Sequence, residues 1–342
     1  MKKAAVFLKV ALTSLVLSAG EWKIELKPYA GMIYGTQDEF VFSKCADGKT
    51  RKLSELNWEL KPVFFGGIQG TAHFKKLFLS AEIESAVPQH CGTVYDSDWM
   101  NCTSPFVLNG SAYGIKTNYS ESSCKLERFF QAGISAGYEV LSTPLCSVIP
   151  FAGIDYSYSR MHASGGTGWY ADNSSGGFYS EKAYKFYQEN GYFGDWRLCD
   201  KNLDLCSVRL ERNTAFAWLG AKLLLNPSQN ISIGLEGAVS PFSYIQSLDR
   251  HYTDKDETYA SYYLDTMHGF FRAVKGSAEI SFFFSKHHGI SLSAGGMISS
   301  TIRGTSAMRY GTSRHGTYAR LKSESGCSFS GLAISAGYTF RL

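Results

Sequence analysis

The chain has 342 residues and a formal net charge of +4 at pH 7, and this mild charge is spread along the sequence, which gives no case for a nucleic-acid partner. Aromatic residues make up 15% of the chain and glycine fills 34 positions, whereas proline fills only 8, a composition that suits a sheet-rich closed structure. No apolar run after Glu21 reaches the roughly 18 residues that a membrane-spanning helix needs, so the sequence excludes a helical membrane protein.

The first residues have the layout of a secretory signal peptide. Two lysines near the start precede an apolar run, and small residues follow it up to Gly20. We predict a signal peptide over 1–20 and a single domain over 21–342, because nothing in the remaining chain resembles a linker. No lipobox cysteine follows the apolar run, so we expect an exported protein without a lipid anchor.

Several later segments alternate apolar with small or polar residues, which is the pattern of a β-strand with two different faces. A soluble β-sandwich also alternates, but it seldom carries so many Gly, Ser and Glu on the face opposite the apolar one. A transmembrane β-barrel turns the apolar face to lipid and the polar face to its lumen, so we predict an all-β outer-membrane barrel. The alternating segments are LFLSAEIES from Leu77, FQAGISAGYEV from Phe130, ISIGLEGAV from Ile231, SAEISFFF from Ser277, GISLSAG from Gly289 and the final GLAISAGYTFRL.

Short and long connections alternate between these strands. This alternation predicts a ten-stranded antiparallel barrel with both termini on the periplasmic side and five long extracellular loops on one rim. The short turns are expected at 73–76, 142–146, 226–230 and 286–288, and the long loops near 35–50, 88–120, 165–205, 252–265 and 305–325.

The stretch DSDWM in the second long loop places two carboxylates, Asp96 and Asp98, one residue apart. In an extended segment both lie on one face, and two like charges so close disturb each other's protonation. Catalysis, a solvated loop and a calcium-type oxygen site all remain open for this motif alone. Counting evenly from Ser80, both aspartates carry the inward phase.

A second pair, Asp249 and His251, stands in SLDRHYTD at the entry to the fourth long loop. An aspartate beside a histidine holds the imidazole tautomer and raises its basicity, as a general base requires, although a surface histidine beside an acid is the commoner case. Alternation counted from Ile231 turns both residues toward lipid. We therefore predict a β-bulge between Val239 and Leu248, with Pro241 as its plausible location.

The chain contains eight cysteines, an even number that permits disulfides in an exported protein without selecting their connectivity. Two local pairs, Cys91 with Cys102 and Cys199 with Cys206, are favoured as loop staples. No C-x-x-C pair with matching histidine spacing predicts a zinc site, so no metal is expected.

The two acidic motifs, D-x-D-W-M after the third strand and D-x-H-Y after the seventh, together resemble the omptin family of outer-membrane endoproteases. The first loop and second strand, YGTQDEFVF and RKLSELNWELKP, are similar to the same family. So are TNYS at 117–120 and AGIDYSYSRMHASGG at 152–166. The resemblance covers the whole mature chain in strand order, and it is strongest at the two catalytic pairs.

This resemblance implies an aspartate/histidine endopeptidase in the outer membrane with its active site facing the exterior. Asp249 would orient His251, which would deprotonate a water, while Asp96 and Asp98 would help to position that water. Glu39 matches the acid at the floor of the family's specificity pocket, and a negative cleft attracts basic peptide side chains. We expect peptide or protein substrates cleaved near basic residues, contact with membrane lipids, no cofactor and a monomer.

The sequence departs from the family in four respects. Ser247 stands where omptins usually have a second pocket acid, which makes the substrate-binding site less acidic. Tyr156 and Tyr158 replace the glutamate and arginine that contact lipid A phosphate, with Arg160 nearby, so activation by lipopolysaccharide is not implied directly. The cysteines are more numerous than in typical omptins, and the last residue is Leu342 rather than an aromatic.

Two other functions compete with the protease. The first is a non-catalytic barrel that acts as an adhesin or binding protein, with the acidic pairs left from ancestry. The second is a passive pore, which the charges expected inside a narrow ten-stranded lumen disfavour. These charges are Glu82, Glu84, Glu139, Glu236 and Glu279 with Lys23 and Lys27.

Overall fold

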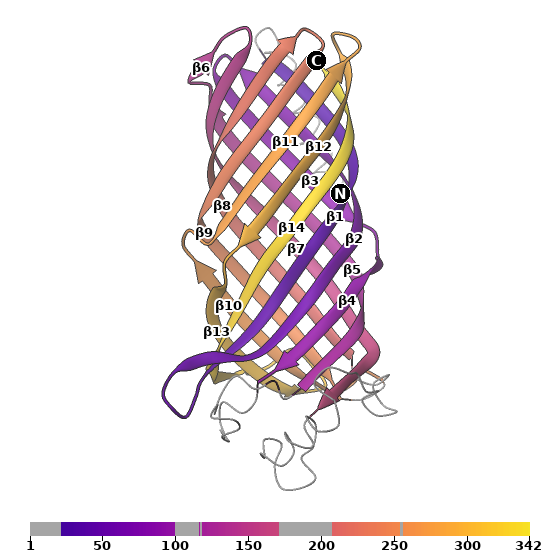
Figure 1. Ribbon diagram of the computed structural model, residues 1–342, viewed down its shortest axis with the longest axis vertical. Helices are drawn as coiled ribbons and strands as arrows, with labels where there is room; N and C mark the ends of the chain where they lie inside the picture. Colours follow the sequence, from indigo (N-terminus) through magenta and orange to yellow (C-terminus); the bar gives the residue numbers. More distant parts are fainter. Residues whose placement is uncertain (1–21, 100–115, 117, 171–206, 254–255) are drawn as a thin grey trace.

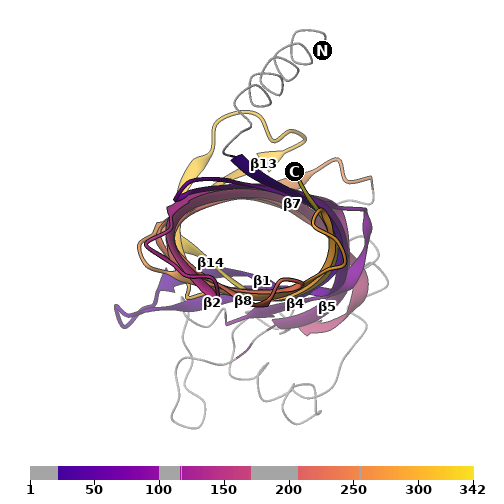
Figure 2. The same ribbon diagram turned by 90° about the horizontal axis from the view of Figure 1, so that it is seen from above.

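The computed structural model describes residues 22–99, 116, 118–170, 207–253 and 256–342, and these residues form one antiparallel sheet. Its strands are β1 (Trp22–Lys44), β2 (Thr50–Phe74), β3 (Leu77–Ala86), β4 (Gln89–Asp98), β5 (Asn118–Tyr138), β6 (Leu141–Ser142), β7 (Cys146–Tyr170), β8 (Ser207–Ser228), β9 (Ile231–Tyr252), β10 (Ala260–Gly269), β11 (Ala273–Phe283), β12 (His288–Ser299), β13 (Ile302–Gly311) and β14 (Ala319–Arg341). Strand β1 pairs with β14 from Glu25 opposite Arg341 to Phe42 opposite Glu324, so the sheet closes into a ring. Figures 1 and 2 show the closed ring of strands from the side and from above.

Ten strands make up the barrel wall, as predicted. Three of them are interrupted once, because β3 and β4 both pair with β2 and β5, β10 and β11 both pair with β9, and β12 and β13 both pair with β14. Each of these couples is one wall strand with a break of two or three residues. The two-residue β6 lies in the turn before β7 and adds no strand to the ring.

The strands extend further toward the long-loop end than the sequence pattern predicts. Strand β1 runs to Lys44, although a loop was predicted near 35–50. Strand β4 runs to Asp98, so the prediction that DSDWM belongs to a loop is wrong for its two aspartates. The apolar alternation marks only the part of a strand that faces lipid, whereas the backbone ladder continues where both faces are polar.

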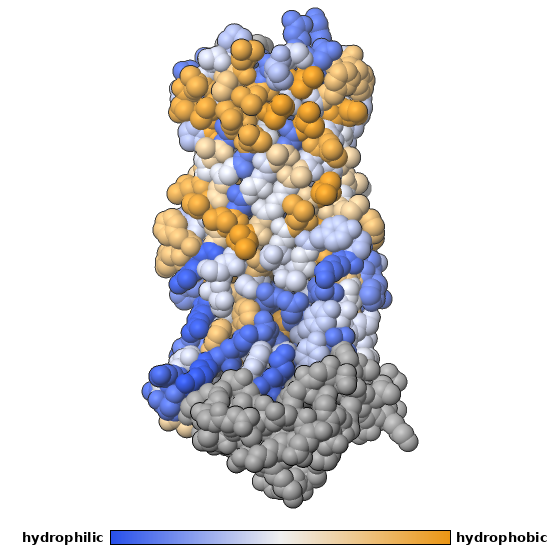
Figure 3. All heavy atoms as spheres, viewed as in Figure 1, coloured by the Kyte–Doolittle hydropathy of each residue, from blue (hydrophilic) through white to orange (hydrophobic). Residues whose placement is uncertain are grey.

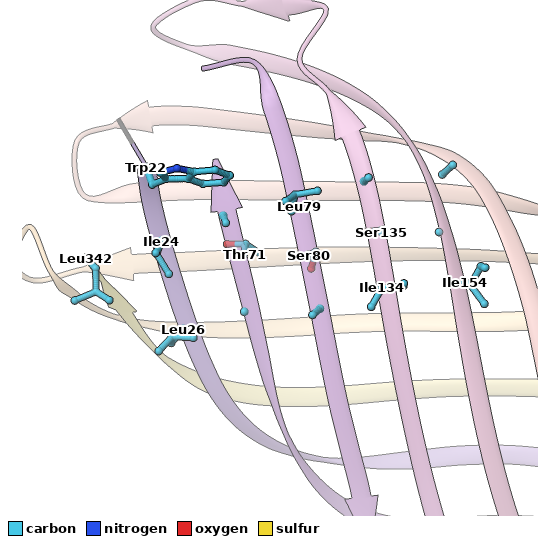
Figure 4. Close-up of a pocket in the computed structure, with 16 residues that line it drawn as sticks. Trp22, Ile24, Leu26, Thr71, Leu79, Ser80, Ile134, Ser135, Ile154 and Leu342 are labelled. Carbon is cyan, nitrogen blue, oxygen red and sulfur yellow. The ribbon is translucent and has the colours of Figure 1, made fainter. Parts of the chain in front are cut away.

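The outer wall is apolar over the half of the barrel that carries β6 and the C-terminus, and hydrophilic over the half next to the long loops (Figure 3). Exposed side chains such as Ile83, Ile134 and Ile280 confirm that the apolar phase of the strands points outward. A hollow of about 980 Å³ lies on this wall between Trp22, Leu342 and neighbouring apolar side chains (Figure 4), and we assign it to the lipid-facing surface. No helix among the described residues is long and apolar enough to cross a membrane.

The barrel interior holds paired charges and buried apolar side chains. Three ion pairs join different strands. Lys27 with Glu279 and Lys275 with Asp155 link strands that are not neighbours, whereas Lys222 with Glu236 links the adjacent strands β8 and β9. Two buried apolar groups lie nearer the long-loop end, one around Trp58, Leu126, Met161 and Leu210 and the other around Phe216, Trp218, Ile245 and Met267. A narrow lumen filled in this way disfavours a passive pore.

Strand β9 contains the bulge that the sequence predicts between Val239 and Leu248. Between two ladder pairs with β8, β9 has one residue more than its neighbour, at Ser240 and Pro241. The extra residue exchanges the two faces of the strand, so Val239 points outward before the bulge and Tyr244 after it. The prediction is confirmed, and the rest of β9 has the phase that turns Asp249 and His251 inward.

The cysteines do not pair as predicted in the described part of the chain. Cys91 is a free thiol, so the predicted pair with Cys102 is wrong. The other predicted pair, Cys199 with Cys206, lies outside the described residues. A register shift beside Gly92 turns Cys91 into the wall, where its Sγ lies 3.3 Å from the Sγ of Cys124 on β5. Both thiols are fully buried.

We expect Cys91 and Cys124 to join when the protein is refolded in the presence of oxidised glutathione, because their thiols are accessible before folding and their sulfurs lie in contact afterwards. The link would close a loop of about 33 residues and raise the free energy of unfolding by about 4 kcal/mol. Peptide mapping of oxidised, unfolded and alkylated protein measures the link, and Cys124→Ser is the control. Alkylation of both thiols in the oxidised wild type would contradict the prediction.

Candidate active site

Asp249 and His251 project from the inner face of β9 near the long-loop end of the barrel. Asp249 is buried, and His251 keeps 38% of its side chain exposed. The Nε2 atom of His251 lies 2.5 Å from Oδ2 of Asp249, which leaves the other ring nitrogen of His251 directed away from this bond. The ring of Tyr263 on β10 packs edge-on against the His251 ring, with centroids 5.5 Å apart. The imidazole is therefore held by one hydrogen bond and one aromatic contact.

Asp96 and Asp98 project inward from β4. They lie opposite Leu56 and Ser54 of β2 in the ladder, and the burial of Leu56 confirms that this face of the sheet points inward. The side-chain amide of Asn118 donates a hydrogen bond of 3.0 Å to Oδ2 of Asp98. The Oδ1 atom of Asp96 is buried and accepts no hydrogen bond from any described residue. An unbonded carboxylate oxygen in this place can receive a water or a substrate donor.

The two pairs influence each other's protonation although β5, β7 and β8 separate their strands in the ring. Burial, together with the negative charge of Asp98, raises the pKa of Asp96 to about 8, against the opposing charge of His251. Burial also raises the pKa of Asp98 above its ordinary value. Strands β4 and β9 thus bring the two pairs close enough for their charges to interact, and we call this part of the barrel the cleft.

Burial alone would lower the pKa of His251. The charge and the hydrogen bond of Asp249 outweigh this effect and raise the pKa to about 9, with smaller contributions from Asp96 and Glu39. Asp249 thus stabilises the imidazolium form, which is the form that a histidine base reaches when it accepts a proton.

Glu39 and Ser247 share one partner, and Glu39 lies close enough to Asp249 for their charges to interact. Arg212 on β8 is 1% exposed, and its guanidinium lies 3.2 Å from Oε1 of Glu39 while its Nε donates a hydrogen bond of 3.0 Å to Ser247. The indole N–H of Trp58 donates to the other oxygen of Glu39, at 2.9 Å. The carboxylate of Glu39 is therefore already paired within the chain.

The sequence interpretation missed two charged residues of the cleft, Arg212 and Asp265. Arg212 lies directly opposite Ser247 on β8, and Asp265 lies directly opposite Ser247 on β10. Arg212 shares the inward phase of Leu210 and Thr214, a signal that alternation along β8 contains. No comparable alternation of buried and exposed residues predicts that Asp265 points inward. Its strand β10 is interrupted after Gly269, so the alternation along β11 does not continue into it.

Tyr156 and Tyr158, which the sequence resemblance aligns with the family's lipid A contacts, lie on β7 together with Arg160. Tyr156 is 42% exposed and donates a hydrogen bond of 2.7 Å to Asn213. Arg160 forms an ion pair with Glu127, which also lies 3.4 Å from Arg209. Arg160 is thus engaged by a carboxylate of the same chain.

A closed barrel with an apolar outer band and a carboxylate–histidine cleft near one rim defines a β-barrel protein of the outer-membrane class. The sequence profile of the Omptin family matches residues 22–342, and the chain belongs to the omptin family of outer-membrane proteases.

The fold is similar to that of the outer membrane protease OmpT from Escherichia coli. The TM-score is 0.74 at 14% sequence identity, and the match covers 94% of this chain and 97% of OmpT. The translocator domain of the autotransporter NalP from Neisseria meningitidis matches with a TM-score of 0.34 at 9% identity, over 100% of this chain and 95% of that one. No curated protein sequence matches the chain.

Proposed function

We propose that this chain is an outer-membrane endopeptidase that cleaves peptides or proteins near basic residues with a water activated by Asp249 and His251. The observation that carries the proposal is the hydrogen bond between Asp249 and His251, which lies close enough to Asp96 for their charges to interact. No serine or cysteine nucleophile is required, and no cofactor.

In the proposed reaction the water lies between the two pairs. The ring nitrogen of His251 that is not bonded to Asp249 takes a proton from the water as the oxygen attacks the scissile carbonyl. Asp249 holds the ring and stabilises the imidazolium, which then returns the proton to the leaving amine. The free Oδ1 of Asp96 accepts the second hydrogen of the water, and Asn118 fixes Asp98 beside it.

Charge and position favour a basic side chain next to the cleaved bond. The cleft gathers Asp96, Asp98 and Asp249 around one histidine, and such a field attracts cations from solution. Glu39 and Ser247 would form the floor of the pocket that receives the side chain. The site would face the exterior after removal of residues 1–20, with the barrel over 21–342 acting as a monomer among membrane lipids.

The test is cleavage of a fluorogenic peptide with a central arginine by the folded barrel, with and without lipopolysaccharide and beside a variant with Asp96→Asn and Asp98→Asn. We expect cleavage by the wild type that resists serine-directed and thiol-directed reagents, and a loss of about 10²- to 10⁴-fold in the variant. The arm with lipopolysaccharide shows whether the lipid is an activator.

A folded wild type that cleaves nothing in either arm would contradict the proposal and favour a non-catalytic binding protein. Sensitivity to a serine-directed or thiol-directed reagent would contradict the water mechanism alone. The change in electrophoretic mobility of a barrel on heating measures folding in both cases.

A further inference from the structure

The acids of the pocket floor are not equally available to a substrate. Ser247 has no charge, and both carboxylate oxygens of Glu39 have partners within the chain, Arg212 and Trp58. Arg212 already supplies the positive charge beside Glu39 that a substrate cation would otherwise supply. Recognition of a basic side chain in this cleft therefore needs another carboxylate.

We infer that Asp265 is the specificity-determining residue, and that its carboxylate receives the ammonium or guanidinium group of the substrate side chain. The inference rests on the proposed function, because it assigns the substrate contact of the same cleft. Arg212 and Glu39 are then a structural ion pair beneath the pocket.

The register of the wall brings Asp265 to the pocket. It lies opposite Ser247 of β9 and opposite Ser306 of β13, in the same row of the sheet as Arg212. Asp249 lies two residues further along β9 toward the rim, opposite Tyr263. If the scissile bond of a substrate lies at Asp249 and His251, the side chain next to that bond can thus extend deeper into the barrel to Asp265.

The carboxylate of Asp265 lacks a partner for one of its oxygens. Its Oδ1 is buried and accepts no hydrogen bond from any described residue, and no described cation forms an ion pair with Asp265 within 4.0 Å. A buried acceptor of this kind is unfavourable unless a donor reaches it. The ammonium or guanidinium of a substrate carries such a donor together with the complementary charge.

Asp265 is charged at neutral pH. Burial raises its pKa to about 6, and the hydrogen bond from Ser306 and the charge of Arg212 oppose this rise. Asp265 is therefore mostly ionised at neutral pH. A substrate cation at the pocket floor meets its negative charge there.

The test compares two fluorogenic peptides that differ only in arginine or methionine at the central position, with Asp265→Asn as the variant. We expect the wild type to prefer arginine in kcat/KM, and the variant to lose at least about tenfold of this preference while its kcat/KM for the methionine peptide changes little. Asp265→Glu, which keeps the charge, should restore part of the preference. Asp47→Asn is the matched control, because this exposed carboxylate pairs with Arg51 in the connection between β1 and β2, outside the site, and it should leave the preference intact. Glu39→Gln tests recognition by Glu39 instead.

An unchanged preference in a folded Asp265→Asn variant would overturn the inference, and so would a preference abolished by Glu39→Gln but not by Asp265→Asn. Both results leave the proposed protease standing, provided that the wild type cleaves the peptides. A wild type that cleaves neither peptide overturns both proposals. Heat-dependent mobility on a gel checks that each variant is folded.

Discussion

Replacing His251 by alanine is expected to lower kcat/KM for peptide cleavage by about 10²- to 10⁴-fold without unfolding the barrel. In the proposed mechanism the ring takes the proton from the water, and Asp249 is bound to it at 2.5 Å. With alanine in its place, the water has no base. The side chain is 38% exposed and is not part of a buried apolar cluster, so its loss should leave the fold intact.

The control for this variant is His268→Ala, which removes a histidine from the exposed face of β10. We expect its kcat/KM to equal that of the wild type within about twofold, as is usual for an exposed residue away from a site. Cleavage retained by His251→Ala, or lost equally in His268→Ala, would show that the cleft is not the active site.

The second large effect is a rise of activity with pH. The pKa of His251 is raised to about 9 in the folded protein, chiefly because Asp249 outweighs the effect of burial. A base must be neutral to accept a proton, so the active fraction grows by about tenfold per pH unit while the pH stays well below that pKa. We expect kcat/KM to increase from pH 6 toward pH 9, measured with a peptide that has no group titrating in this range.

Asp249→Asn tests the cause of this profile. The substitution removes the charge that raises the pKa of His251, so the rising limb should move to lower pH even though the highest rate falls. Stability is expected to change in the opposite direction: the raised pKa of His251 stabilises the fold fully below the ordinary value of 6.5, and this contribution is lost as the pH rises through about 9. A flat or falling rate between pH 6 and pH 9 in a barrel that stays folded would contradict the assignment of His251 as the base.

Local patterns in the sequence were enough to predict the wall of the barrel. Alternation with a period of two gives the outward face of each strand, because neighbouring side chains of a strand point to opposite sides whatever the strand pairs with. Ile83 and Ile134 illustrate this, since both lie where the alternation places them. The bulge at Pro241 was also predictable, because proline lacks the N–H that a regular ladder needs.

The ends of the strands were not predictable in the same way. Beyond the lipid both faces of a strand meet polar surroundings, so Asp96 and Asp98 read as loop residues although they continue the ladder of β4 with β2 and β5. Backbone hydrogen bonds form between groups that nearly every residue carries, so the side chains of a segment do not show where the pairing continues. Only the paired strands decided that these aspartates stand on a rigid wall.

The sequence by itself thus determined the class of fold, the faces of the strands and the order of the two acidic motifs, all of which depend on neighbours a few residues apart. The tertiary structure decided that Cys91 lies against Cys124 and that Arg212 forms an ion pair with Glu39. It also decided that Asp265 stands beside Ser247. These contacts join strands distant in the chain, and their register follows from how the whole ring closes, which no local pattern encodes.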